Sequence, residues 1–122
     1  MYNLNRFIDQ QKTYYDIALK EIKNGYKSSH WMWFIFPQLK GLGTSEMAEY
    51  YGLNGIEEAK AYYENKYLRS NLLEISKALL KVENKSINYI LEYPDNLKLK
   101  SCMTLFELVN KDEQVFKDIL EK

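Results

Sequence analysis

The only histidine of the chain, His30, stands beside both tryptophans, Trp31 and Trp33, in an apolar run that ends at Pro37. Histidine ordinarily titrates near neutral pH, so His30 is the natural proton donor or acceptor if the protein is a catalyst. His30 could equally be a neutral core residue with one ring nitrogen bonded to a backbone carbonyl. Residue types leave both interpretations open.

The two tryptophans offer flat faces on which a nucleobase or a nicotinamide ring could stack. Such stacking contributes about 1–3 kcal/mol per base in proteins that bind single strands. Large aromatic side chains also dominate the burial of protein cores, and packing is the simpler role for each ring. The sequence does not distinguish Trp31 from Trp33 as a ligand-binding residue.

A glycine-rich turn follows the aromatic run and contains Gly41, Gly43 and Ser45. Glycines let the backbone approach a ligand, and a helix that starts after the turn directs unpaired N–H groups at an anion. The turn is neither a Walker A motif nor a dinucleotide fingerprint. An ordinary turn with Ser45 as the N-cap is the simpler interpretation, and a phosphate cradle is the alternative.

A polar cluster with Asp95 and Ser101 follows Pro94. A Ser–His–Asp triad could be drawn from Ser101, His30 and Asp95, but the chain has no G-x-S-x-G elbow and no alternation of strands and helices. Capping of a helix by Ser101 or Asp95 is a simpler role. Cys102 is expected to be a small core residue.

Composition excludes several classes of function. With 17 basic and 17 acidic residues among 122, the chain has no charge surplus of the kind that drives nonspecific binding to nucleic acid or anionic membranes. One cysteine and one histidine cannot form an internal disulfide or a zinc cage, and no cofactor motif is present. The longest apolar run is far shorter than the about 20 residues that span a bilayer, and no signal peptide is evident. We expect a cytoplasmic protein; its oligomeric state is not predicted.

The apolar pattern predicts an all-α fold, a compact bundle of about six to seven helices in a single domain over residues 1–122. The aromatic run fits either a short buried strand or a buried helix, and Pro37 should end either one. Asn54 with Glu57 resembles a capping box, and we expect Glu57 and Glu58 to be solvated. Helices are predicted at about 4–23, 46–51, 54–65 and 68–82, with a short turn near 87–91 and two further elements marked by 105–109 and by 115–120 after Asp112 as N-cap.

Several segments resemble the bacterial domain of unknown function 1810 family. The distinctive ones are Ser29 to Leu39, with its His-Trp-Met-Trp sequence, and Asp95 to Phe106, with Met-Thr-Leu-Phe. The resemblance runs over almost the whole chain and implies a small all-helical protein of no established activity. Residues 65–72 depart from the family pattern His-Pro-x-Leu-Gly-x-Arg-Leu, which leaves His30 as the only imidazole.

Together these features predict one pocket for a phosphate-bearing small molecule of the NAD or ADP-ribose type. The NAD and ADP-ribose part rests on a remote likeness to helical domains proposed to process such compounds. His30 would be the acid or base if the ligand is hydrolysed. The alternatives are a module that sequesters such a ligand without catalysis and a protein-interaction domain. The predicted ligand-binding residues are Trp31, Trp33, Gln38, Gly41, Gly43, Ser45, Lys27, Lys98 and Ser101.

Overall fold

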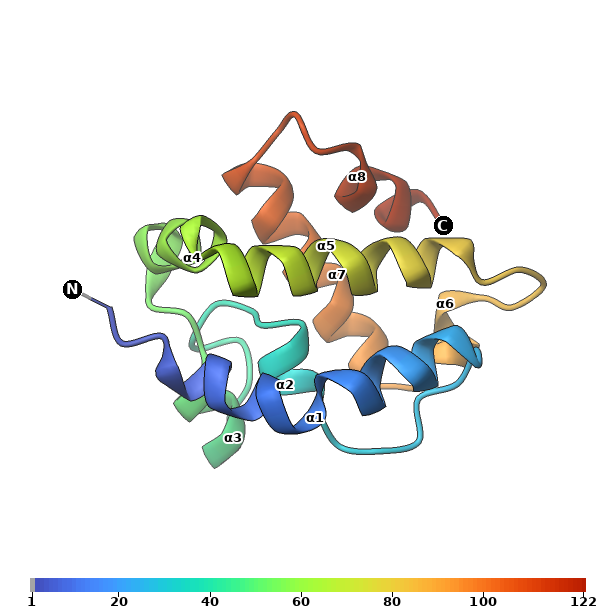
Figure 1. Cartoon of the computed structure of the whole chain (residues 1–122), viewed down its shortest axis with the longest axis horizontal. Helices are drawn as coiled ribbons and strands as arrows, with labels where there is room; N and C mark the ends of the chain where they lie inside the picture. The colour runs from blue at the N-terminus through green and yellow to red at the C-terminus, as the bar shows by residue number, and fades with distance from the viewer. Residues whose placement is uncertain (1) are drawn as a thin grey trace.

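The computed structural model describes residues 2–122, and among these it has eight α-helices and no β-strand (Figure 1). The predicted all-α fold is confirmed. The helices outnumber the predicted six to seven because two of them, α2 and α6, are single four-residue turns. In chain order the helices are α1 (Asn5–Lys23), α2 (Met32–Ile35), α3 (Glu46–Tyr51), α4 (Gly55–Glu64), α5 (Lys66–Lys81), α6 (Ile87–Ile90), α7 (Asp95–Val109) and α8 (Gln114–Glu121).

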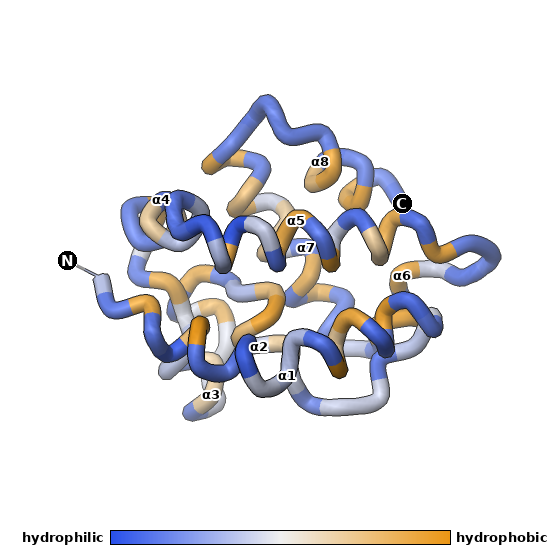
Figure 2. Tube along the Cα trace, in the orientation of Figure 1, coloured by the Kyte–Doolittle hydropathy of each residue, from blue (hydrophilic) through white to orange (hydrophobic). Residues whose placement is uncertain are grey.

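Helix α5 lies in the middle of the bundle, with α1 on one side and α8 on the other (Figure 1). Helix α7 packs against α4 and α8. The apolar stripe predicted for α5 is the face that becomes buried, from Leu68 to Leu79. Hydrophobic residues recur along the helices, whereas the connections from α5 to α6 and from α7 to α8 are hydrophilic (Figure 2).

A row of aromatic rings connects four helices through the core. The Phe7 ring on α1 meets Tyr62 on α4 edge-on at 5.1 Å, and Tyr62 lies 5.4 Å from Phe106 on α7. Phe106 in turn lies 6.2 Å from Phe116 on α8. Aromatic pairs at these separations contribute about 0.5–1.5 kcal/mol beyond their burial, so the row stabilises the contacts between distant segments.

The aromatic run forms a helical turn rather than a strand. Trp31, Phe34 and Phe36 are buried, and the turn ends before Pro37 as predicted. Gln11 of α1 holds the end of the turn, because its buried side-chain amide donates to the Phe34 carbonyl at 2.8 Å. The same amide group donates to the Tyr62 hydroxyl and accepts from Asn71, so its hydrogen-bonding capacity is satisfied.

The chain after the aromatic run is fixed by one isolated parallel bridge between Leu39 and Leu53. The Lys40 N–H donates to the Leu53 carbonyl at 2.8 Å, and the Leu53 N–H donates to the Gln38 carbonyl at 2.9 Å. Gly52 is required beside this bridge, since an added Cβ would lie 2.6 Å from the Lys40 Cα. The bridge therefore fixes the backbone at Gln38 relative to α3.

Glu58 corrects the prediction for the start of α4. It is 1% exposed rather than solvated, and its carboxylate accepts two hydrogen bonds of 3.1 Å from the Arg6 guanidinium. The Asn54 N–H also donates to Glu58 at 2.7 Å, so Glu58 and not Glu57 interacts with the helix start. Burial alone would raise the pKa of Glu58, but the hydrogen bonds from Arg6 and Asn54 outweigh it and lower that pKa.

The start of α8 is a smaller correction. Glu113 occupies the N-cap position, while the Asp112 N–H donates to the Asn110 side chain at 3.1 Å. Because the chain turns at Asn110, the helix begins one residue later than an Asp112 cap would allow.

No helix within residues 2–122 combines the length and hydrophobicity that crossing a membrane requires.

We expect Glu58→Ala to lower the free energy of unfolding by about 3 kcal/mol, because the change leaves the Arg6 guanidinium partly buried without its carboxylate. The matched control is Glu57→Ala. Glu57 is 71% exposed, and its one ion pair within residues 2–122 is a surface pair with Lys60, so its loss should cost less than about 0.5 kcal/mol. Urea unfolding of both variants measures the difference, and equal losses would contradict the structural role of the Arg6–Glu58 pair.

Candidate functional site

A groove of about 530 Å³ lies between the segment that leads into α2 and the start of α7. We call it the α2–α7 groove. Its volume falls in the range of small-molecule binding sites. Four of the predicted site residues line it: His30, Trp33, Lys27 and Lys98. The other lining residues are Tyr26, Ser28, Ser29, Met32, Glu92, Tyr93, Pro94 and Asp95.

The Glu21 carboxylate of α1 positions the wall of the groove that carries His30. It accepts hydrogen bonds from the Ser28 N–H at 2.8 Å, the Ser29 N–H at 3.0 Å and the Trp31 Nε1 at 2.9 Å. The Ser29 hydroxyl donates to its second oxygen. Burial alone would raise the pKa of Glu21, but these hydrogen bonds outweigh it and lower the pKa to about 2.

Two lysines flank the carboxylate of Asp95, which lies on the opposite wall at the start of α7. Lys27 Nζ lies 2.8 Å from one Asp95 oxygen, and Lys98 Nζ lies 3.8 Å from the other. Lys27 Nζ also lies 5.0 Å from the centre of the Trp31 ring, and Lys98 Nζ lies 5.1 Å from that of Trp33. Ion pairs and cation–π contacts thus form a continuous row that fixes both ammonium groups.

His30 lies exposed at the rim of the groove. The interpretation of His30 as a core histidine is therefore wrong. No hydrogen bond of its side chain occurs among residues 2–122, so the ring is open to a ligand but has no partner that fixes its orientation. A general acid or base works best when a second group orients it.

Trp33 forms part of the groove and also the wall of a smaller recess behind it. Gln38, Tyr51 and Gly52 line that recess, together with Lys98. Its volume of about 10 Å³ is no larger than the space that one water molecule needs. Gln38 consequently lies behind the groove. The buried Nε1 of Trp33 has no hydrogen-bond partner within residues 2–122.

Comparison with protein families gives a match over residues 1–122 to "Protein of unknown function (DUF1810)". The chain belongs to this family. The predicted resemblance is thereby confirmed. Among solved structures, the fold is similar to that of the conserved hypothetical protein Rv1873 from Mycobacterium tuberculosis, with a TM-score of 0.94 and 42% sequence identity over 97% of this chain and 84% of that one. The comparison with curated proteins gave no match.

The DUF1810 fold buries Trp31 completely, so this ring does not line the groove. The glycine-rich turn also lies outside it. Ser45 accepts a hydrogen bond from the Ala48 N–H at 3.1 Å as the N-cap of the six-residue α3, and Gly43 packs closely on Ala48. Gly41 is exposed and has a φ of +96°, a conformation that glycine adopts readily. The turn is explained as a helix start.

Ser101 lines a different groove of about 340 Å³, beside Leu39, Leu42 and Leu108. It does not line the groove that holds His30 and Asp95. The Ser–His–Asp arrangement considered from the sequence therefore receives no support from the fold. Cys102 is fully buried as predicted, and burial raises the pKa of its thiol.

Sequence reasoning missed Glu21, and it considered Asp95 only as a helix cap or as the acid of a triad. The N-cap position of α7 is Pro94, Asp95 is the first helical residue, and Ser101 lies inside the helix, so neither Asp95 nor Ser101 caps it.

No local pattern reveals the partners of Glu21 or the pair of Asp95 with Lys27, since Asp95 lies 68 positions after Lys27 in the sequence. The i,i+3 spacing of Asp95 and Lys98 is a local signal for the longer of the two ion pairs. For the pair of Lys27 and Asp95, the available signal is that both residues stand in segments that resemble the DUF1810 family. That signal marks the residues without showing that they form an ion pair.

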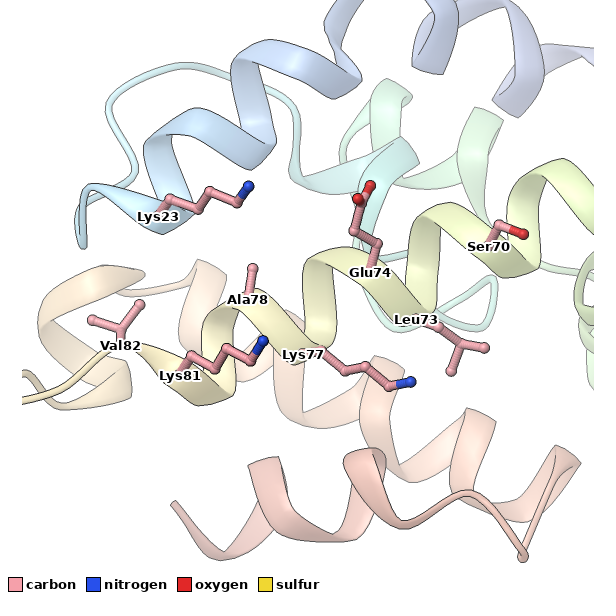
Figure 3. A pocket seen from close by; sticks show the side chains of 8 residues that line it. All are labelled: Lys23, Ser70, Leu73, Glu74, Lys77, Ala78, Lys81 and Val82. Atoms are coloured by element: carbon pink, nitrogen blue, oxygen red, sulfur yellow. The ribbon is translucent and has the colours of Figure 1, made fainter.

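A second large groove, of about 590 Å³, lies along α1 and α5 (Figure 3). Lys23, Lys77 and Lys81 line it, but none of the predicted site residues does. Lys23 and Lys81 occupy the last turns of α1 and α5, where positive charge stabilises the helix dipole. Because this explains two of the three lysines, and because no aromatic side chain of residues 2–122 lines this groove, we take the α2–α7 groove as the candidate site of this DUF1810 protein.

We expect Glu21→Gln to destabilise the protein at pH 7, with a smaller effect in acid. The lowered pKa means that the Glu21 carboxylate stabilises the fold above its ordinary pKa of 4.5 and loses this effect as the pH falls toward about 2. The difference in free energy of unfolding between the wild type and the variant should therefore shrink from pH 7 to pH 2.

The control for this experiment is Glu83→Gln, which changes an exposed carboxylate outside the groove. Denaturant unfolding followed at several pH values gives all three stabilities. If the effect of Glu21→Gln stayed constant between pH 7 and pH 2, the charge of Glu21 would not be what holds the Ser28–Trp31 segment.

Proposed function

We propose that the α2–α7 groove binds a phosphate-bearing small molecule of the nucleotide type, such as a ligand derived from NAD or ADP-ribose. The observation that carries this proposal is the combination of two fixed ammonium groups, Lys27 and Lys98, with the Trp33 ring in one hollow of ligand size. Charge for a phosphate and an aromatic face for a base are the two recognition elements that a nucleotide requires.

We assign the phosphate-binding role to Lys27 and Lys98. A lysine ammonium is a compact charge with three donors, and lysine is a common ligand of phosphate groups in proteins. The side chains of Lys27 and Lys98 are 9% and 22% exposed, so water screens their charges less than those of surface lysines. This partial burial supports a specific contact rather than general attraction of anions.

The base-binding role goes to the aromatic side chains. The half-buried Trp33 ring lies in the groove, and Tyr26 and Tyr93 add rings that are 39% and 79% exposed. The Tyr26 hydroxyl donates to Glu92 at 2.6 Å, which restrains this ring beside the groove. A base that stacks on one of these rings would gain about 1–3 kcal/mol.

His30 is the candidate for acid–base catalysis if the bound molecule is hydrolysed. Its exposed position at the rim supports contact with a ligand, but it lacks an orienting partner among residues 2–122. The geometry therefore supports binding more directly than hydrolysis, and a module that sequesters the ligand unchanged is the first form of the proposal.

A protein-interaction role is the second candidate function. The observation that favours it is the groove beside Ser101, where Leu42 and Leu108 are 59% and 55% exposed. Exposed apolar side chains that lie together are typical of surfaces that bind other proteins. This role predicts that nucleotides neither bind to the protein nor raise its melting temperature.

The binding proposal predicts that Lys98→Gln weakens the affinity for adenosine monophosphate by about tenfold or more, the effect of losing one charged contact. Lys100→Gln is the control, since Lys100 is an exposed lysine on the same helix that does not line this groove. Isothermal titration calorimetry measures both affinities. Equal nucleotide affinities of the two variants would show that Lys98 does not contact the ligand. An absence of nucleotide binding by the wild type would overturn the proposal.

We expect His30→Ala to change the free energy of unfolding by less than about 0.5 kcal/mol, because the ring is exposed and unbonded within residues 2–122. For any nucleotide that the wild type hydrolyses, the variant should lose about 100-fold or more in turnover. Chromatography of the incubated ligand measures turnover. Full activity of the variant would exclude His30 as the acid or base.

A further inference from the structure

We infer that the Asp95 carboxylate competes with the ligand's phosphate for Lys27 and Lys98, and that the α2–α7 groove binds a ligand with a terminal phosphate monoester. The inference rests on the proposed function, because it concerns the ligand of the same groove. It goes beyond that function by naming the charged group that the ligand must carry and the side chain that this group displaces.

Asp95 occupies the place where an anion would be held by both lysines. One carboxylate oxygen lies 2.8 Å from Lys27 Nζ and the other lies 3.8 Å from Lys98 Nζ. The Asp95 side chain is 19% exposed and lines the groove itself. A phosphate can contact both ammonium groups only if this carboxylate moves aside or shares them.

The exchange favours the more highly charged anion. A phosphate monoester carries about 1.5 to 2 negative charges at pH 7, whereas a carboxylate carries one. Replacing the carboxylate by a phosphate diester of single charge leaves the attraction to the lysines nearly unchanged. Replacing it by a monoester adds attraction to both of them, and partial burial of the three side chains strengthens this difference. A terminal phosphate monoester can therefore displace the Asp95 carboxylate from the two lysines, whereas a phosphate diester gains little attraction by doing so.

The other acidic group of the groove does not serve the same purpose. Glu92 accepts the hydrogen bond from the Tyr26 hydroxyl and is not paired with either lysine. Asp95 also stands in the first turn of α7, where a carboxylate stabilises the helix dipole. A purely structural role of this kind would leave ligand affinity unchanged when the carboxylate is removed, so the two roles have different consequences.

The test measures the affinities of adenosine monophosphate, NAD and adenosine by calorimetry for the wild type and for Asp95→Asn. We expect Asp95→Asn to bind adenosine monophosphate about tenfold more tightly, because the phosphate no longer displaces a charged partner of the lysines. Adenosine, which has no phosphate, should gain nothing. The wild type should prefer adenosine monophosphate to NAD, whose two phosphates carry a single charge each.

The matched control is Asp112→Asn, which makes the same change of net charge at an exposed position between α7 and α8. It should leave all affinities unchanged. Asp95→Ser serves as a second variant if Asp95→Asn does not fold, since serine is also favoured at helix starts. Thermal unfolding of each variant checks that it is folded.

Weaker or unchanged binding of adenosine monophosphate by folded Asp95→Asn would overturn the competitor role while leaving the proposed function intact. Equal affinity of the wild type for NAD and adenosine monophosphate would overturn the preference for a terminal phosphate. An absence of binding by the wild type and by every variant would overturn the proposed function, and this inference with it.

Discussion

Two side chains of α1 hold the aromatic segment, and the arrangement of the candidate site depends on them. Glu21 accepts four hydrogen bonds from the start of this segment, and the Gln11 amide donates to the Phe34 carbonyl near its end. A four-residue turn is too short to be stable alone, because helix formation has a costly nucleus. Hydrogen bonds to Glu21 and Gln11 of the neighbouring helix α1 stabilise the turn instead.

These hydrogen bonds also decide which aromatic residues face the groove. The Trp31 ring is fully buried in the core, and its Nε1 donates to the partly exposed Glu21 carboxylate. Trp33, two residues later, remains half-buried and contacts Lys98 across the groove. His30 lies at the rim because the backbone on its N-terminal side is fixed to Glu21. The Glu21 carboxylate thus holds the segment with Trp31 in the core and with His30 and Trp33 on the side that is open to a ligand.

Much of the fold could be predicted because helices depend on residues that are near in sequence. The stripe from Leu68 to Leu79 follows from spacings of three and four residues, and the Ser45 cap follows from a serine directly before the helix. The aromatic run could not be assigned in this way, since almost every residue in it is apolar and no periodicity remains. Glu58 was placed in solvent for a different reason: its partner Arg6 lies 52 positions away.

By itself the sequence determined the family, most of the helices and four of the groove residues: Lys27, His30, Trp33 and Lys98. Only the tertiary structure decided that the glycine-rich turn and Ser101 lie elsewhere, and that Asp95 stands between two lysines. The physical reason is that composition and periodicity report on local backbone preference and on burial. Ion pairs and hydrogen bonds between distant side chains arise only when packing brings their helices together.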